Sequence, residues 1–258
     1  GINGSLEDLN TNISNITTAD DDVNISFDTI TAATATNKNH LNAVLAATKG
    51  TVTGSITGSA AVLSAITANS GTKNQLLLTV SNQASVTQAT SIIAATSALD
   101  QNGLLAITFH SDGISGSLTD LNTNISTITA VDNQINISFD TIGTATATNK
   151  NHLNNILAAT SGTVSGSITG PAAVLSVITP NQGTKNDLTL SVSDAASVTQ
   201  ATSIIDATKN DTVAFNVGIS DSLAELNGTD ILTKITTADP DVAISFDEIT
   251  DADATNKT

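Results

Sequence analysis

The sequence predicts an α/β fold, specifically a right-handed α/β solenoid with one short helix and one parallel strand in each coil of roughly 24–31 residues and about nine coils in all. Three observations lead to this prediction. A long segment recurs in the chain, helical apolar spacing alternates with strand-like alternation throughout, and the apolar residues are mostly small and branched. The apolar content of 39% includes 5 Phe and no Trp, Tyr, Met or Cys, which suits thin, regular layers.

The clearest repeat is the stretch at 37–48 (NKNHLNAVLAAT), which returns at 149–160 as NKNHLNNILAAT. A third copy begins with Asn256 and Lys257. We therefore expect a first long repeat at 1–112 and a second at 113–217, each with four coils, and an incomplete third at 218–258, all in one continuous solenoid. Because both termini align with positions inside the repeat, we expect the chain to be a section of a longer array.

Each expected helix carries apolar residues at helical spacing. The first runs from Ser5 to about Ile16, and the others in the first repeat lie near 37–48, 60–66 and 86–96. Gly50 follows the second helix and is expected to end it. Three pairs have the spacing of a helix-capping box. They are Ser5 with Asp8, Ser117 with Asp120, and Ser222 with Glu225.

Each expected strand follows a helix and alternates apolar with polar residues. The strands of the first repeat are at 23–27, 51–57, 76–80 and 104–109, and those of the second at 135–139, 164–168, 188–192 and 213–217. A ninth strand is expected at 242–246. Because a helix separates successive strands, they should pair in parallel with right-handed crossovers.

The charge of the chain excludes several classes of partner. The net charge is −16, from 8 basic and 24 acidic residues, and all basic residues are lysine. Nucleic acids and anionic membrane surfaces require basic patches, so neither is an expected partner. The absence of cysteine excludes disulfides and zinc–thiolate sites. No apolar run reaches the roughly 18 residues that a membrane-spanning helix needs, so we expect no membrane insertion.

Two acidic turns are the best candidates for a metal site. Asp20, Asp21 and Asp22 precede the first strand, and Asp239 and Asp241 occupy the matching turn near the end of the chain. Calcium prefers oxygen ligands, so it is the one cofactor that these turns suggest. The alternative is ordinary turn chemistry, in which aspartate stabilises the bend. The glycine- and aspartate-rich nonapeptide of RTX calcium repeats is absent.

No other motif predicts a chemical site, and we expect no enzyme activity. His40 and His152 are equivalent positions about four coils apart, roughly 19 Å by strand spacing, which is too far to share a metal ion. The glycines at 50, 54 and 58 lack the lysine of a phosphate-binding loop. We expect Gly54 and Gly166 to let a helix approach the sheet closely.

The outward face of the expected strands is small and polar. Its residues are Asn24, Ser26, Thr53, Ser55, Thr79, Asn136, Ser138, Ser165, Ser167, Thr189 and Ser191. This face is either an ordinary solvated surface or a surface for lateral assembly or ligand binding.

Several runs resemble a known class of repeat. The segments at 50–58 (GTVTGSITG), 63–67 (LSAIT) and 84–96 (ASVTQATSIIAAT) are similar to the Ala/Thr-rich repeats of giant secreted, RTX-associated cell-surface proteins of cyanobacteria and other Gram-negative bacteria. This resemblance covers essentially the whole chain. It implies an extracellular or cell-surface structural role, in a filament, surface layer or adhesin, and it assigns no site residues.

These observations favour a structural segment of a large extracellular repeat protein that self-assembles into a filament, sheath or surface layer. Its main partner would be itself, joined end to end or laterally. The alternative is an adhesin-type binding module that uses the flat polar sheet face to bind glycans or another surface. A third reading is a passive spacer that holds a distal domain away from the cell.

Overall fold

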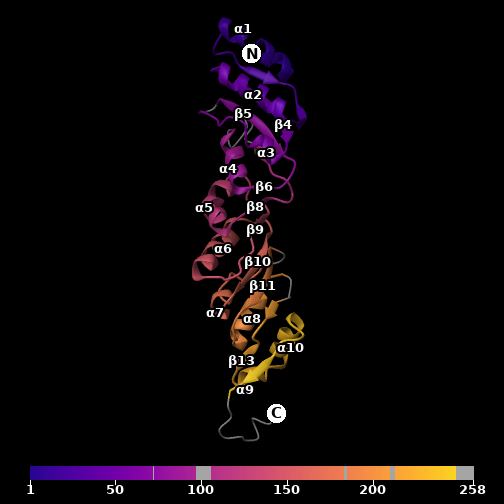
Figure 1. Cartoon of the computed structure of the whole chain (residues 1–258), viewed down its shortest axis with the longest axis vertical. Helices are drawn as coiled ribbons and strands as arrows, with labels where there is room; N and C mark the ends of the chain where they lie inside the picture. The colour runs from indigo at the N-terminus through magenta and orange to yellow at the C-terminus, as the bar shows by residue number, and fades with distance from the viewer. Residues whose placement is uncertain (72, 97–105, 183–184, 210–212, 248–258) are drawn as a thin grey trace. The chain divides into compact units, whose positions relative to one another are not determined.

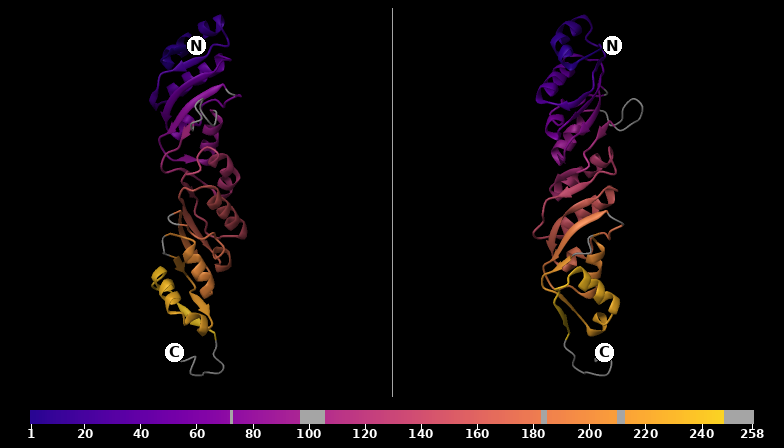
Figure 2. Two further views of the ribbon diagram at one scale, coloured as in Figure 1. Left: turned by 180° about the vertical axis from the view of Figure 1, so that it is seen from behind. Right: turned by 90° about the vertical axis from the view of Figure 1, so that its right-hand side faces the viewer.

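The computed structural model describes residues 1–71, 73–96, 106–182, 185–209 and 213–247. In these residues it has a mixed α/β fold with parallel strands and ten helices (Figure 1). The chain forms two compact units, one of Gly1–Gly116 with Thr123–Asn136, the other of Ser117–Asn122 with Ile137–Thr258. One or two strands separate most successive helices of each unit, and Figure 2 shows the chain from two further sides. The predicted α/β class and parallel pairing are confirmed for the described residues.

The first unit is built on a parallel sheet with strand order β1-β2-β4-β5-β7, in which β3 also pairs with β4, and on a further pair of β6 with β8. Its strands are β1 (Ile2–Gly4), β2 (Ile25–Phe27), β3 (Ile30–Ala33), β4 (Val52–Gly58), β5 (Asn74–Val80), β6 (Ala84–Ser85), β7 (Ile107–Thr108) and β8 (Ile114–Gly116). Its helices are α1 (Leu6–Ala19), α2 (Ala35–Ala47), α3 (Ala60–Leu63) and α4 (Val86–Ala94). The chain of α5 (Leu118–Thr129) belongs in part to each unit.

The second unit repeats this arrangement with strands in the order β9-β10-β11-β12 and a separate pair of β13 with β14. Its strands are β9 (Ile137–Phe139), β10 (Val164–Gly170), β11 (Asn186–Val192), β12 (Val213–Phe215), β13 (Ile219–Asp221) and β14 (Ile244–Phe246). Its helices are α6 (Ala147–Ala159), α7 (Ala172–Leu175), α8 (Val198–Asp206), α9 (Leu223–Leu226) and α10 (Thr229–Ala238).

Like residues face one another across the parallel strands. Ile25 is paired with Ile2 on one side and with Val52 on the other. Further along the sheet, Leu78 is paired with both Ile56 and Ile107. Because alternate residues of a strand point to the same face, these apolar side chains form continuous rows beneath the sheet, where the helices cover them. The rows are the core of the unit.

The helix starts are fixed by local hydrogen bonds, as the sequence pattern indicates. The hydroxyl oxygen of Ser5 accepts a hydrogen bond from the Asp8 N–H at 3.1 Å, and Ser117 does the same for Asp120. At α2, Thr34 and Asn37 form a reciprocal capping box. The second helix therefore begins two residues before the predicted stretch, because its cap lies upstream of the repeated motif.

Two predictions about the helices and strands are wrong. Gly50 does not end α2, which stops at Ala47 with Thr48 as its cap, and Gly50 is not among the residues with positive φ. The sequence also predicts one strand per coil, whereas five further short strands (β1, β3, β6, β8 and β13) flank the expected ones. The polar pair Asp28-Thr29, for example, separates β2 from β3. The predicted strand at 104–109 lies partly outside the described residues.

Buried polar side chains hold strands and helix ends together. The Thr48 hydroxyl donates to the Val23 carbonyl at 2.7 Å and accepts from the Gly50 N–H at 3.0 Å. Asn74 is also buried, and its amide donates to the Ala95 carbonyl at 3.0 Å. Since a buried polar group without a partner would be costly, these bonds explain why threonine and asparagine are tolerated inside a small aliphatic core.

Candidate functional site

The outward sheet face of the first unit carries a row of polar side chains. The strand register places Asn3, Ser26, Thr53 and Gln75 next to one another on β1, β2, β4 and β5. The Ser26 hydroxyl donates to the Asn3 side-chain oxygen at 3.1 Å. None of the four side chains belongs to a buried residue. The row therefore presents closely spaced hydroxyl and amide groups to solvent.

A shallow depression lies along this row. It has a volume of about 550 Å³ and is lined by Gly1, Asn24, Ile25, Ser26, Thr51, Thr53 and Gln75. The polar side chains that line it are neutral hydroxyls and amides. Groups of this kind can bind the hydroxyls of a sugar, but they offer no charge for a phosphate or a carboxylate.

The second unit has the matching row with one charged pair added. Ser138, Ser165 and Asp187 are aligned by the register of β9, β10 and β11. The Asp187 carboxylate lies 3.1 Å from the ammonium nitrogen of Lys209. The equivalent residue to Asp187 in the first unit is the neutral Gln75, so the two outward faces share their shape and hydroxyls but differ in charge.

Two asparagines predicted on the outward face act as links between neighbouring strand ends. The Asn24 side-chain oxygen accepts from the Thr51 N–H at 2.8 Å. The Asn136 amide donates to the Ser111 carbonyl at 2.8 Å. The hydrogen bonds of these two side chains thus hold the chain itself together, which leaves the serines and threonines of the row as the groups best placed to contact another molecule.

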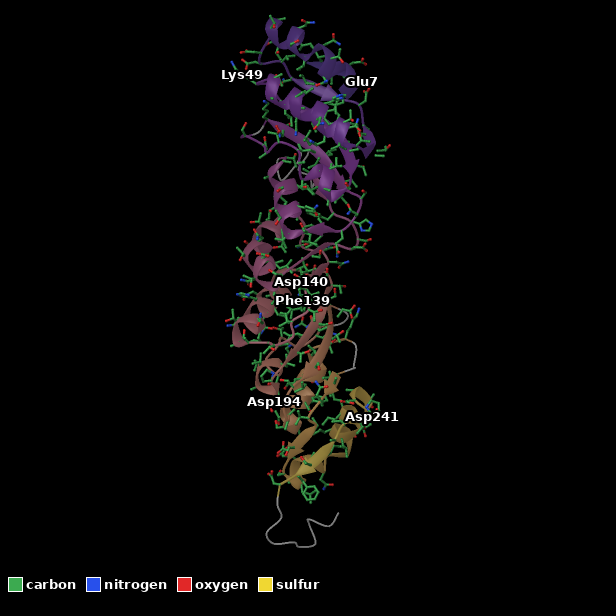
Figure 3. All side chains as sticks on the ribbon, viewed as in Figure 1. Glu7, Lys49, Phe139, Asp140, Asp194 and Asp241 are labelled. Atoms are coloured by element: carbon green, nitrogen blue, oxygen red, sulfur yellow. The ribbon has the colours of Figure 1, made fainter. Side chains whose placement is uncertain are left out.

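The acidic turn at Asp20, Asp21 and Asp22 is held by its own chain. The Asp20 carboxylate accepts from the Asp22 N–H at 3.1 Å, and the Asp21 carboxylate lies 2.5 Å from the Lys49 ammonium group. This hydrogen bond with Asp21 raises the pKa of Lys49 above its usual 10.5. Figure 3 labels Lys49, which is exposed. Two of the three carboxylates therefore serve as turn and ion-pair groups.

The second acidic turn separates its two aspartates. The Asp239 carboxylate accepts from the Phe215 N–H at 2.8 Å and so fastens the end of α10 to β12. Asp241 is exposed at the surface of the unit (Figure 3). Among the described residues, no three His, Cys, Asp or Glu side chains form a group that could hold a metal ion. The calcium sites remain a prediction from the sequence.

The equivalent histidines lie on equivalent helices, His40 on α2 and His152 on α6. The Nδ1 atom of His152 is buried without a hydrogen-bond partner. His152 belongs to no group of three His, Cys, Asp or Glu side chains that could hold a metal ion among the described residues.

Two lysines that no sequence motif singles out bind helix ends. The ammonium groups of Lys73 and Lys185 donate to the carbonyl oxygens of Leu45 and Leu157, near the C-termini of α2 and α6. A cation is favourable there because helix carbonyls carry partial negative charge. Burial lowers the pKa of Lys185 below its usual 10.5. The sequence shows one sign of this shared role: Lys73 and Lys185 are separated by 112 residues, the offset of the long repeat.

The glycines predicted to admit a helix admit an aromatic ring instead. A β-carbon on Gly54 would lie 2.4 Å from the Phe27 ring, and one on Gly166 would lie 2.6 Å from the Phe139 ring. Each ring comes from the preceding strand of the same sheet, β2 or β9. Pairing of a phenyl ring with a glycine thus recurs in both units.

No family of known proteins, no curated protein and no solved structure matches this chain. Among the described residues, no helix is both long enough and apolar enough to cross a membrane.

Proposed function

We propose that this chain is a structural segment of a large extracellular repeat protein that self-assembles into a filament, sheath or surface layer. In this proposal the strands and helices form one continuous right-handed solenoid of about nine coils across the repeats at 1–112, 113–217 and 218–258. Its function is mechanical: parallel strand pairing and rows of aliphatic side chains resist deformation, and the outward face joins one molecule to the next.

The observation that carries the proposal is that hydrogen bonds linking separate segments of the fold occur at equivalent positions in both units. Lys73 and Lys185 make the same bond to a helix end, and Asn74 and Asn186 make the same buried bonds. The second repeat has Asp194 where the first has Asn82, and both side chains accept the same backbone hydrogen bond. In the first unit Asn82 accepts from the Ala60 N–H at 2.8 Å, and in the second Asp194 accepts from the Ala172 N–H at 2.6 Å. The features that recur are those that hold coil to coil, as a scaffold requires.

The outward face suits lateral assembly because its side chains are short. Serine and threonine hydroxyls lose little side-chain entropy when two flat surfaces meet, and each can donate and accept. The net charge of −16 opposes this contact at low ionic strength, so assembly should need physiological salt.

Electron microscopy of the purified chain at 150 mM salt tests the proposal. We expect fibres or sheets that disperse when Ser55→Glu and Ser167→Glu are combined, because both substitutions add negative charge to the outward face that forms the proposed contact. The matched control combines Thr87→Glu and Thr199→Glu, which add the same charge at exposed helix positions. Dispersed monomers at every concentration, or equal dispersal by the control, would contradict the proposal.

The depression on the outward face favours adhesion as the second candidate function. Its hydroxyls and amides are the groups that bind neutral sugars. A glycan array probed with the full chain would then show binding that Thr53→Trp abolishes. The control Thr87→Trp places the same bulk on an exposed helix position and should leave binding unchanged. Absence of binding to every glycan would reject this candidate.

A further inference from the structure

Two ion pairs of the second unit join segments that are far apart in the sequence. The Asp187 carboxylate on β11 lies 3.1 Å from the ammonium nitrogen of Lys209, in the segment before β12. The Asp206 carboxylate at the end of α8 lies 2.6 Å from that of Lys234 on α10, 28 positions along the chain. In the part of the chain that the structure describes, these are the lysines within ion-pair distance of the two carboxylates.

Two further carboxylates of this unit accept hydrogen bonds from the backbone of distant helices. Asp194, labelled in Figure 3, accepts from the N–H of Ala172 at 2.6 Å, across 22 positions. Asp221 of β13 accepts from the N–H of Val198 at 3.0 Å, across 23 positions. A hydrogen bond to an ionised acceptor is about twice as strong as one between neutral groups. Four ionised carboxylates therefore connect the segments of the second unit.

The first unit has an uncharged residue at each of the four equivalent positions. These residues are Gln75, Asn82, Ala94 and Gly116. The first three precede their counterparts by the long-repeat offset of 112, and Gly116 is matched to Asp221 by the flanks of GISGSL and GISDSL. Asn82 makes the same link as its counterpart without charge, since it accepts from the Ala60 N–H at 2.8 Å.

The carboxylates that the first unit does contain contribute little between segments. Among its described residues, one ion pair joins distant segments, that of Asp21 with Lys49. These side chains are 55% and 71% exposed, so water and salt screen the pair. The carboxylates of Asp8 and Asp20 bond within their own turns. The two units thus share one architecture but differ in their dependence on ionised carboxylates.

The elements packed around the four carboxylates of the second unit carry few other charges. β10, β12, β14 and α7 contain no charged residue. Helix α8 carries no charge besides Asp206, and α10 carries Asp230 and Lys234. None of these elements contains a histidine. Between pH 7 and pH 3 the lysines stay charged, so the carboxylates are the groups whose charge changes.

We propose that the chain contains an acid-sensitive device, in which the second unit loses its structure before the first as the pH falls. Protonation removes the attraction of Asp187 and Asp206 for their lysines and the charge assistance of the bonds to Asp194 and Asp221. These contributions are complete at neutral pH and are lost through the range in which aspartates bind protons, about pH 5 to 3. The amide of Asn82 keeps its bond throughout this range.

This inference goes beyond the proposed scaffold role and does not depend on it, because it concerns the dispersed chain. The test records amide NMR spectra of the full, ¹⁵N-labelled chain in steps from pH 7 to pH 3, which follow the two units separately. Signals of the second unit should move to unfolded positions at a pH at least about half a unit above those of the first. Simultaneous loss of both units, or earlier loss of the first, would overturn the proposal.

A variant that gives the second unit the residues of the first identifies the groups responsible. Asp187→Gln, Asp194→Asn and Asp206→Ala are combined, which places the residue types of positions 75, 82 and 94 in the second unit. The loss of the second unit should shift to lower pH by at least about half a unit and so approach that of the first. An unchanged difference between the units would count against the four carboxylates.

The matched control removes the same number of charges from exposed positions of the second unit. It combines Asp140→Asn, Glu225→Gln and Asp230→Asn, whose side chains make no link to a distant segment among the described residues. Figure 3 labels Asp140. The second unit should still be lost first. Equal effects of the two triple variants would assign the response to net charge and overturn the proposal.

A reciprocal variant keeps the test independent of the folding of an altered second unit. Asn82→Asp introduces into the first unit the carboxylate that Asp194 provides in the second, facing the Ala60 N–H. The first unit should then be lost at a higher pH than in the unsubstituted chain. Asn15→Asp adds the same charge at an exposed position of α1 and should cause no such rise. No rise with Asn82→Asp, or an equal rise with both variants, would contradict the inference.

Discussion

The phenyl ring of Phe27 occupies the space that a side chain at Gly54 would need, since a β-carbon there would lie 2.4 Å from the ring. The two residues are on neighbouring strands, in the register that pairs Ile25 with Val52. This contact fixes which residue of β4 can stand beside the ring, and a shift by one position would bring a bulkier residue against it.

Gly54→Val should destabilise the chain by about 1–3 kcal/mol, because the added carbons force the Phe27 ring out of its position. Urea unfolding followed by circular dichroism measures the change. Gly143→Ala is the control: a β-carbon at this exposed glycine has no atom within 4 Å. An unchanged unfolding midpoint for Gly54→Val would show that the ring does not pack as described.

Thr48→Val should cost about 1–3 kcal/mol although it keeps the side-chain shape. The substitution removes the donor to the Val23 carbonyl, a buried hydrogen bond, and the acceptor for the Gly50 N–H, a partly buried one. Thermal unfolding measures the loss. Thr18→Val is the comparison, since the Thr18 hydroxyl bonds only to the Ser14 carbonyl on an exposed helix turn. Equal effects of the two variants would be inconsistent with a buried role for Thr48.

Lys185 and Lys49 should give pH dependences of opposite sign. Burial lowers the pKa of Lys185 in the folded chain, so the unfolded state binds more protons, and stability rises with pH up to the usual value of 10.5. The hydrogen bond with Asp21 raises the pKa of Lys49, so its contribution is complete below 10.5 and is lost as pH rises through the higher folded value.

Lys185→Met and Lys49→Met isolate these contributions. The free energy of unfolding is measured by urea titration from pH 8 to 11, and each variant is subtracted from the unsubstituted chain. The difference should rise with pH for Lys185→Met and fall above pH 10.5 for Lys49→Met. If this difference changed with pH in the same way for both variants, the two lysines would not differ in environment.

Sodium chloride should raise the melting temperature, because the net charge of −16 produces self-repulsion that salt screens. Differential scanning calorimetry in 10, 150 and 500 mM salt measures this. Calcium is then compared with sodium chloride at equal ionic strength. A further calcium-specific increase that Asp20→Asn with Asp22→Asn removes would establish the first acidic turn as a calcium site. A melting temperature that responds to neither salt nor calcium would contradict the charge argument.

Local features of this fold could be predicted from the sequence, and contacts across strands could not. The cap at Ser5 and the apolar face of α1 depend on spacings of three and four residues, which the sequence displays directly. The ring of Phe27 over Gly54 depends on strand register, so Gly54 was assigned to the wrong neighbour. The bond from Lys73 to Leu45 joins residues 28 positions apart, and no local pattern indicates it.

The same limit applies to the candidate site. The polar residues of the outward face were identified correctly, because strand alternation alone separates Ser26 from Ile25 and Phe27. What each polar group does could not be predicted. The Asn24 side chain bonds to the Thr51 backbone, while Ser26 stays on the outward row, and this difference depends on the neighbouring strand.

The buried fastening bonds also imply an order of folding. Thr48 reaches back 25 residues to Val23, Asn74 reaches forward 21 to Ala95, and Lys185 reaches back 28 to Leu157. Each bond is complete once the later of its two segments has been made. A chain with such low contact order can fold in the direction of its synthesis, with each new helix and strand adding to a template already in place.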